Sequence, residues 1–123
     1  MSKKVRIKWL NEPEDDDYLG ALSYLSLLYD ERIAKTYVGK LKRASISEFK
    51  ATDIFRASGL PTLGVSDPHV EKDEQKLKSG SKLPPLLLIR DSAHGKLVIA
   101  DGYHRLCAVY FCDEEAVIPC KIA

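Results

Sequence analysis

The chain has 123 residues, of which 45% are hydrophobic and 30% are charged, a length and composition typical of one soluble domain with its own apolar core. That length leaves no room for a second domain of ordinary size. Nineteen Lys and Arg residues face eighteen Asp and Glu residues, so the formal net charge is +1. This balance argues against a broad cationic surface for polyanions, and any anion site is expected to be local.

Cysteine spacing and hydropathy exclude further classes of protein. Three cysteines without a C-x-x-C pair predict neither a disulfide framework nor a structural zinc site. The apolar run at residues 83–89 contains two prolines and is far shorter than the roughly 20 residues that a membrane-spanning helix requires. We therefore expect a cytosolic protein with no membrane partner.

An acidic run before an apolar periodic stretch predicts the first helix. Acidic side chains are stabilising at a helix start, and Pro13 is tolerated in a first turn. We expect this acidic turn to be solvated. Two apolar stripes at helical spacing follow, separated by Asp30, and they predict a helical hairpin within residues 1–46. The stripes consist of Tyr18, Leu22, Leu25 and Tyr29, then Ile33, Tyr37, Val38 and Leu41.

Two shorter helical patterns come next. Thr52 is placed to cap a short helix that Gly59 ends. Ser66 or Asp67 is placed to cap a second helix over residues 69–78. Two of its positions, Val70 and Leu77, are clearly apolar, so we expect this helix at the surface.

The last part of the chain alternates strand and helix patterns. Residues 86–90 and 96–100 predict two strands joined by a turn, residues 106–111 a short helix, and residues 117–122 a closing strand. The whole order predicts an α+β fold. We expect a mixed sheet with surrounding helices over residues 47–123, preceded by the hairpin of residues 1–46 within one compact unit.

The segment from Leu97 to Leu106 carries the chemistry, because an apolar strand runs through one glycine into a helix start. Free N–H groups at a helix start favour a phosphate, and Arg105 can add charge-assisted hydrogen bonds. His104 can donate to a phosphate oxygen or move a proton. Gly102 permits a tight turn. Asp101 can activate an acceptor hydroxyl or hold Mg²⁺ that arrives with a nucleotide.

Plainer interpretations stay open for the same residues. Asp101 can simply cap the helix, His104 can be structural, and Arg105 can pair with an acidic neighbour. Their adjacency favours phosphate binding, because a core does not need these donors together. The pattern is neither a Walker A loop nor a dinucleotide fingerprint, since one glycine is present.

Three stretches together resemble the ParB/sulfiredoxin superfamily. They are residues 83–88, residues 98–106 with Asp-Gly-Tyr-His-Arg, and residues 118–122 with Ile-Pro-Cys-Lys-Ile. The resemblance is strong over residues 83–122, extends back to about Ser47, and does not include the hairpin. It implies a ParB/sulfiredoxin-like fold in which Gly102, Tyr103, His104 and Arg105 hold the phosphates of ATP, ADP or CTP, with Mg²⁺ as a further expected cofactor.

Departures from the family narrow the activity that the resemblance implies. Tyr103 stands where sulfiredoxin has its cysteine nucleophile, and Cys107 is expected to be a buried small residue, so sulfiredoxin activity is not expected. The chain ends at Ala123 without the DNA-reading helix-turn-helix of partition proteins. The turn is most similar to that of the ADP-dependent free-serine kinase, which implies Asp101 and His104 as catalytic candidates and Glu71 as a further one.

Other polar residues are weaker candidates. Lys72, with its helix neighbours Gln75 and Lys76, is placed to contact a nucleotide or simply to face water, and the same holds for His69. His94 is expected to be exposed and inert. The basic N-terminus with Trp9 is expected to be solvated.

Three functions follow as hypotheses. The first is a nucleotide-binding protein that hydrolyses NTP or transfers its phosphate. The second is a non-catalytic, nucleotide-responsive regulator or adaptor whose hairpin docks a protein partner. The third, a ParB-like DNA-binding protein or nuclease, ranks last because the net charge is +1 and the sequence has no carboxylate cluster for two metals.

Overall fold

The computed structural model describes residues 6–61 and 67–123, and these form an α+β fold with five helices and two sheets. Ser66, the alternative helix cap, lies outside the described residues. The helices are α1 (Asp15–Leu28), α2 (Glu31–Arg43), α3 (Ala51–Ser58), α4 (Pro68–Lys78) and α5 (Tyr103–Cys112). The strands are β1 (Lys8–Trp9), β2 (Ser47–Lys50), β3 (Lys82–Leu83), β4 (Leu86–Asp91), β5 (Lys96–Asp101) and β6 (Val117–Ile122).

The main sheet is mixed and has the strand order β2-β6-β4-β5. Strands β4 and β6 are parallel, with Leu86 beside Cys120, and the other two pairs are antiparallel. Residues 86–89 of β4 are all fully buried. Because successive side chains of a strand point to opposite faces, this continuous apolar run requires a cover on both faces of the sheet.

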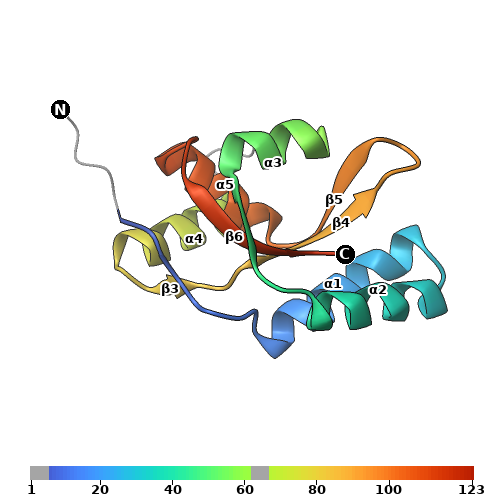
Figure 1. Ribbon diagram of the computed structural model, residues 1–123. Helices are drawn as coiled ribbons and strands as arrows, with labels where there is room; N and C mark the ends of the chain where they lie inside the picture. Colours follow the sequence, from blue (N-terminus) through green and yellow to red (C-terminus); the bar gives the residue numbers. More distant parts are fainter. Residues whose placement is uncertain (1–5, 62–66) are drawn as a thin grey trace.

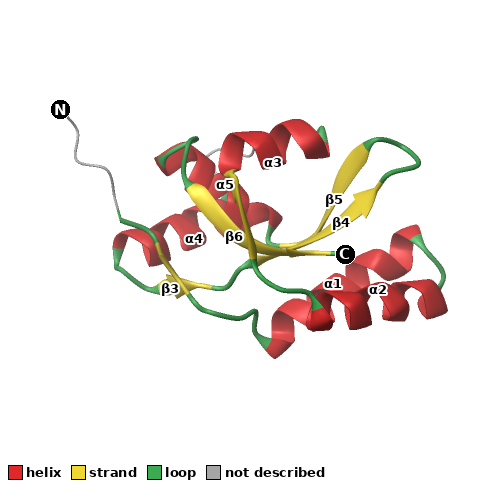
Figure 2. Ribbon diagram, in the orientation of Figure 1, coloured by secondary structure: helices red, strands yellow, loops and turns green. Residues whose placement is uncertain are grey.

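Helices supply both covers, as Figures 1 and 2 show. Leu86 and Leu88 pack into one apolar cluster with residues of α3, α4 and α5. Leu87 and Ile89 pack into a second cluster with residues of α1 and α2. The hairpin is therefore one of three layers, with the sheet in the middle.

The predicted hairpin is present, and most of its stripes pack on the sheet or between its two helices. Leu25 and Leu41 are fully buried, and the rings of Tyr29 and Tyr37 lie 5.2 Å apart across the hairpin. Ile33, by contrast, is 40% exposed. It lies in the first turn of α2, at the end of the hairpin.

Lys121 of β6 ties the sheet to both ends of the hairpin. Its side chain is 5% exposed and pairs with Glu12, ahead of α1, at 3.1 Å. The same ammonium donates to the carbonyl oxygen of Lys42, near the end of α2, at 3.1 Å. A buried Lys is stable when its charge is paired and hydrogen-bonded, so these contacts account for its position.

Some local boundaries differ from the predictions. Lys8 and Trp9 form a strand paired with β3 instead of a solvated terminus. Helix α3 begins at Ala51 because the amides of Ala51 and Thr52 donate to carbonyls of the loop at residues 114–116, so Thr52 is not the cap. Helix α5 begins at Tyr103, three residues earlier than predicted.

Two further expectations, the cap of α4 and the burial of Cys107, are confirmed. The carboxylate of Asp67 accepts from the His69 amide at 2.9 Å and so caps α4. Cys107 is fully buried. Within the described ranges, none of the helices has the length and apolar character needed to cross a membrane.

Candidate anion-binding site

The turn between β5 and α5 depends on a glycine. Gly102 has φ +102°, a conformation that side chains with a Cβ rarely adopt. A Cβ there would lie 2.8 Å from Nη2 of Arg105 and 2.9 Å from Cγ of Leu86. Strand β5 can therefore pass directly into α5, with the first helical turn at the strand end.

The start of α5 opens into a cleft of about 520 Å³. Gly102 is the N-cap residue and provides no side-chain cap. The first N–H groups of a helix have no partner within the helix, so an anion in this cleft would meet them directly. The lining residues are Gly20, Tyr24, Leu60, Pro61 and residues 99–104.

Two histidines stand where two helices begin. The rings of His69, in the first turn of α4, and His104, in the first turn of α5, have their centroids 4.8 Å apart. Asp67 already provides a carboxylate at the start of α4, whereas α5 has no acidic residue in its first turn. Of the two helix starts, that of α5 is therefore the one whose positive dipole end can attract an external anion.

Tyr103 has a structural role at the rim of this cleft. Its hydroxyl donates to the carbonyl oxygen of Pro61, which joins α5 to the segment after α3. Burial raises the pKa of this phenol, with further contributions from Cys107 and Asp67, so Tyr103 remains a neutral donor.

Arg105 points away from this cleft. Its guanidinium donates to Oδ1 of Asp17 at 3.4 Å and to Oδ2 of Asp101 at 3.4 Å. A third donor bond reaches the carbonyl oxygen of Pro85 at 3.2 Å. The side chain is 12% exposed, so Arg105 holds two carboxylates together instead of lining the cleft beside Gly102 and His104.

Asp17 is the site residue that the sequence reasoning missed. It was expected in a solvated acidic turn, yet it is 8% exposed and accepts from the Glu14 amide at 2.7 Å. A signal was available, because Asp17 lies four and eight residues before the buried Ala21 and Leu25, on the same helix face. An acid on that stripe needs a cationic partner, and Arg105 provides it.

Asp101 lies at the back of the cleft, close to α1. A Cβ on Gly20 would be 2.7 Å from its Oδ1 atom, so a glycine in α1 makes room for the carboxyl group. Burial and the neighbouring Asp17 raise the pKa of Asp101 to about 7, against the opposing effect of Arg105. The group therefore exchanges its proton near neutral pH. It does not cap α5, since its Oδ2 accepts from Arg105.

The remaining candidates lie apart from the cleft. Glu71 and Lys72 are exposed on α4 and are not among the lining residues of the cleft. Lys76 and Asp73 instead line a second cleft of about 300 Å³, together with Asp17 and Arg105. His94 is exposed and pairs with Asp91 at 2.8 Å in the β4–β5 turn.

The donor set does not form a resident metal centre. Within residues 6–61 and 67–123, no group of three or more His, Cys, Asp and Glu side chains is placed to hold a metal ion. Asp101 and its neighbour Asp17 are both already bonded to Arg105. The residues present therefore do not fit a protein-bound Mg²⁺.

The fold and the site together define an α+β protein with a glycine turn that leaves a helix start open to a cleft. Comparison of the chain with protein-family models, curated proteins and solved structures found no match.

Proposed function

We propose that this chain is a cytosolic protein of ParB/sulfiredoxin-like fold that binds the phosphates of ATP, ADP or CTP at the start of α5. The observation that carries the proposal is the first turn of α5, which has no side-chain cap and opens into a cleft of about 520 Å³. Backbone N–H groups and the helix dipole together favour an anion at such a place.

The walls of the cleft support a nucleotide over a free phosphate. His104 lies beside the uncapped turn and can donate to phosphate oxygens. Tyr24 and Leu60 add an aromatic ring and an apolar side chain to the lining of the same cleft. A ligand that combines a charged group with a flat, largely apolar part matches this lining.

Asp101 supports hydrolysis or phosphoryl transfer as the activity. When water or an acceptor hydroxyl attacks the terminal phosphorus, the oxygen nucleophile must lose a proton, and the ionised carboxylate can take it. The phosphorus–oxygen bond to the leaving nucleotide breaks in the same displacement. Because the pKa of Asp101 is about 7, turnover should rise as pH increases through neutrality.

The test is a thermal-shift panel of ATP, ADP, CTP and GTP, each followed by titration calorimetry where the midpoint rises. His104→Ala removes one phosphate donor, and we expect a loss of affinity of about tenfold, the size of one charge-assisted hydrogen bond. His94→Ala removes an exposed histidine that does not line the cleft, and this variant should bind like the unaltered protein. Equal affinities for all three proteins would sink the proposal, as would the absence of any shift.

A second candidate, a nucleotide-responsive regulator, is favoured by one contact. Asp17 of α1 bonds to Arg105, directly behind the proposed phosphate site. A nucleotide that pulled Arg105 toward its phosphates would loosen α1 and change the surface offered to a protein partner. Tight binding without turnover, together with faster amide exchange in residues 15–28, would support regulation. Turnover that disappears in Asp101→Asn would instead support the enzyme.

A further inference from the structure

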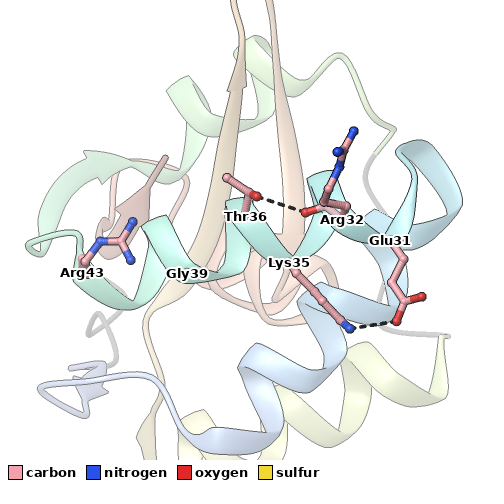
Figure 3. A pocket seen from close by; sticks show the side chains of 6 residues that line it. All are labelled: Glu31, Arg32, Lys35, Thr36, Gly39 and Arg43. Atoms are coloured by element: carbon pink, nitrogen blue, oxygen red, sulfur yellow. Dashed lines mark hydrogen bonds and ion pairs between the residues drawn. The ribbon is translucent and has the colours of Figure 1, made fainter.

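The outward face of α2 carries basic side chains that the proposed nucleotide cleft does not use. It consists of Arg32, Lys35, Thr36, Gly39 and Arg43, which we call the cationic face. Three- and four-residue steps place these residues on one side of the helix. Figure 3 shows Arg43 and Arg32 toward its two ends, with Gly39 and Thr36 between them. Together with Glu31 they line a hollow of about 610 Å³.

Positive charge on this helix is far in excess of its local partners. Five of the thirteen residues of α2 are basic and one is acidic. Lys35 pairs with Glu31 at 3.0 Å, but neither Arg32 nor Arg43 has an ion pair with any residue of the described ranges. Since the whole chain has a net charge of +1, the remainder is net acidic. Three of the five basic residues belong to the cationic face, whereas the ammonium groups of Lys40 and Lys42 lie over the rings of Tyr37 and Tyr18.

Gly39 has no side chain and so leaves space beside it in the middle of the cationic face. Glycine is unfavourable inside a helix, and a Cβ at this position would make an ordinary contact of 3.6 Å with Nη1 of Arg43. The Arg43 side chain thus lies back across the helix, with its guanidinium beside Gly39. This places a charged group near the middle of the cationic face.

The chemistry of the cationic face favours one class of partner. A helix that binds a membrane surface places large apolar side chains in the lipid, and the cationic face has none. Arginine forks match phosphate oxygens in pairs. Arg32 and Arg43 are separated by about 16 Å along the helix, at 1.5 Å per residue, a length that faces several phosphates of a nucleic acid strand.

We propose that the cationic face of α2 is a docking surface for the phosphate backbone of a nucleic acid. Binding of this kind reads no base sequence and depends strongly on salt, because each neutralised phosphate releases a counterion. The small number of cations makes the affinity modest. For binding at this face, the charge on one helix matters more than the net charge of the whole chain.

Fluorescence anisotropy with a labelled 20-base-pair duplex DNA of random sequence tests the proposal. The triple variant Arg32→Gln, Lys35→Gln, Arg43→Gln should bind at least tenfold more weakly at about 50 mM salt, and its slope of log affinity against log salt should be about 2 to 3 smaller. The matched control is Arg56→Gln, Arg90→Gln, Lys96→Gln, which removes the same charge from exposed positions on α3, β4 and β5. Its affinity should change by less than about threefold, which is the effect of net charge alone.

A single variant guards against a loss of folding. Arg32→Glu places an acid in the first turn of α2, where the helix dipole favours it, so the helix should keep its stability while DNA affinity falls further than in Arg32→Gln. Equal losses in the triple variant and its matched control would overturn the proposal. So would the absence of DNA binding at low salt, or binding to anionic vesicles that depends on the same three residues while DNA binding does not.

Discussion

Arg105 has a different role from the one that its place in the sequence suggests. Its position directly after Gly102 and His104 suggested a phosphate ligand, but its guanidinium bonds to Asp17, Asp101 and the carbonyl of Pro85. Its Nε atom is buried without a hydrogen-bond partner among the described residues. The charge is therefore committed to holding α1, β5 and α5 together, and phosphate binding at the start of α5 falls to the backbone and His104.

This arrangement predicts a large stability loss in Arg105→Ala. Both carboxylates would stay in a poorly solvated place without their cation, and breaking such a buried pair costs about 3–5 kcal/mol. Arg56→Ala removes a guanidinium that is 83% exposed and 3.8 Å from Asp53, so its cost should be below about 0.5 kcal/mol. Urea unfolding of the two variants measures the difference. Similar free energies of unfolding would contradict the buried network.

Sequence reasoning located the candidate site but not the direction of its side chains. A glycine between a strand and a helix start is visible in the sequence, and so is the histidine beside it. Neighbouring helix residues point about 100° apart around the axis, since a turn has 3.6 residues. His104 and Arg105 therefore face different clefts. The partner of Arg105 comes from a segment 88 residues away, which no local pattern reports.

At the scale of the element, two glycines inside helices differ in whether packing requires them. In α1, Gly20 leaves space that the Asp101 carboxyl occupies, because an added Cβ would lie 2.7 Å from Oδ1. In α2, an added Cβ at Gly39 would meet Arg43 at an ordinary 3.6 Å. The first glycine is required by packing between layers, and the second is not.

Alanine at each glycine should therefore change stability in opposite directions. Gly39→Ala gains helix propensity without a clash and should stabilise the protein by about 0.5–1 kcal/mol. Gly20→Ala gains the same propensity but pushes Asp101 out of its place, with a net loss of about 1–2 kcal/mol after the overpacking penalty. Thermal or urea unfolding gives both values. A stabilised Gly20→Ala would show that Asp101 moves freely.

Elements with strong local patterns were predictable, and their boundaries were less so. Strand β4 is apolar on both faces because both faces are covered, and its sequence reports this directly. The start of α3 is held by carbonyls of the loop at residues 114–116, and β1 exists through its pairing with β3. Such partners lie far away in the chain, so the fold class follows from the sequence more readily than the ends of its elements.

At the scale of the whole molecule, the hairpin meets the rest of the fold through a polar contact between Asp17, Asp101 and Arg105, in addition to the contacts of Lys121. Asp17 belongs to the hairpin layer, and Asp101 and Arg105 belong to the sheet and the opposite layer. Asp101 ionises with a pKa of about 7, raised mainly by burial and by Asp17. The protonation state of the Asp101 carboxyl group therefore affects the stability of the contact between the hairpin and the rest of the fold.

The sign of the resulting pH dependence follows from linkage. The pKa of Asp101 is about 7 in the folded protein and 3.8 in the unfolded reference, so between these values the folded state binds more protons than the unfolded state. Its contribution to the free energy of unfolding must then fall as pH rises from about 4 to 7 and stay constant above that range. This stability is lost because the buried Asp101 carboxyl group ionises beside the Asp17 carboxyl group.

Asp101→Asn should remove this contribution because the amide resembles the protonated acid. We expect the free energy of unfolding of the variant to change less between pH 5 and pH 8 than that of the unaltered protein, measured by urea titration at each pH. The other ionisable groups are common to both proteins, so the difference between them reports Asp101 together with the Asp17 carboxyl group beside it. Parallel pH profiles would mean that Asp101 is ionised throughout, in which case the proton-transfer role proposed for it at neutral pH would also fail.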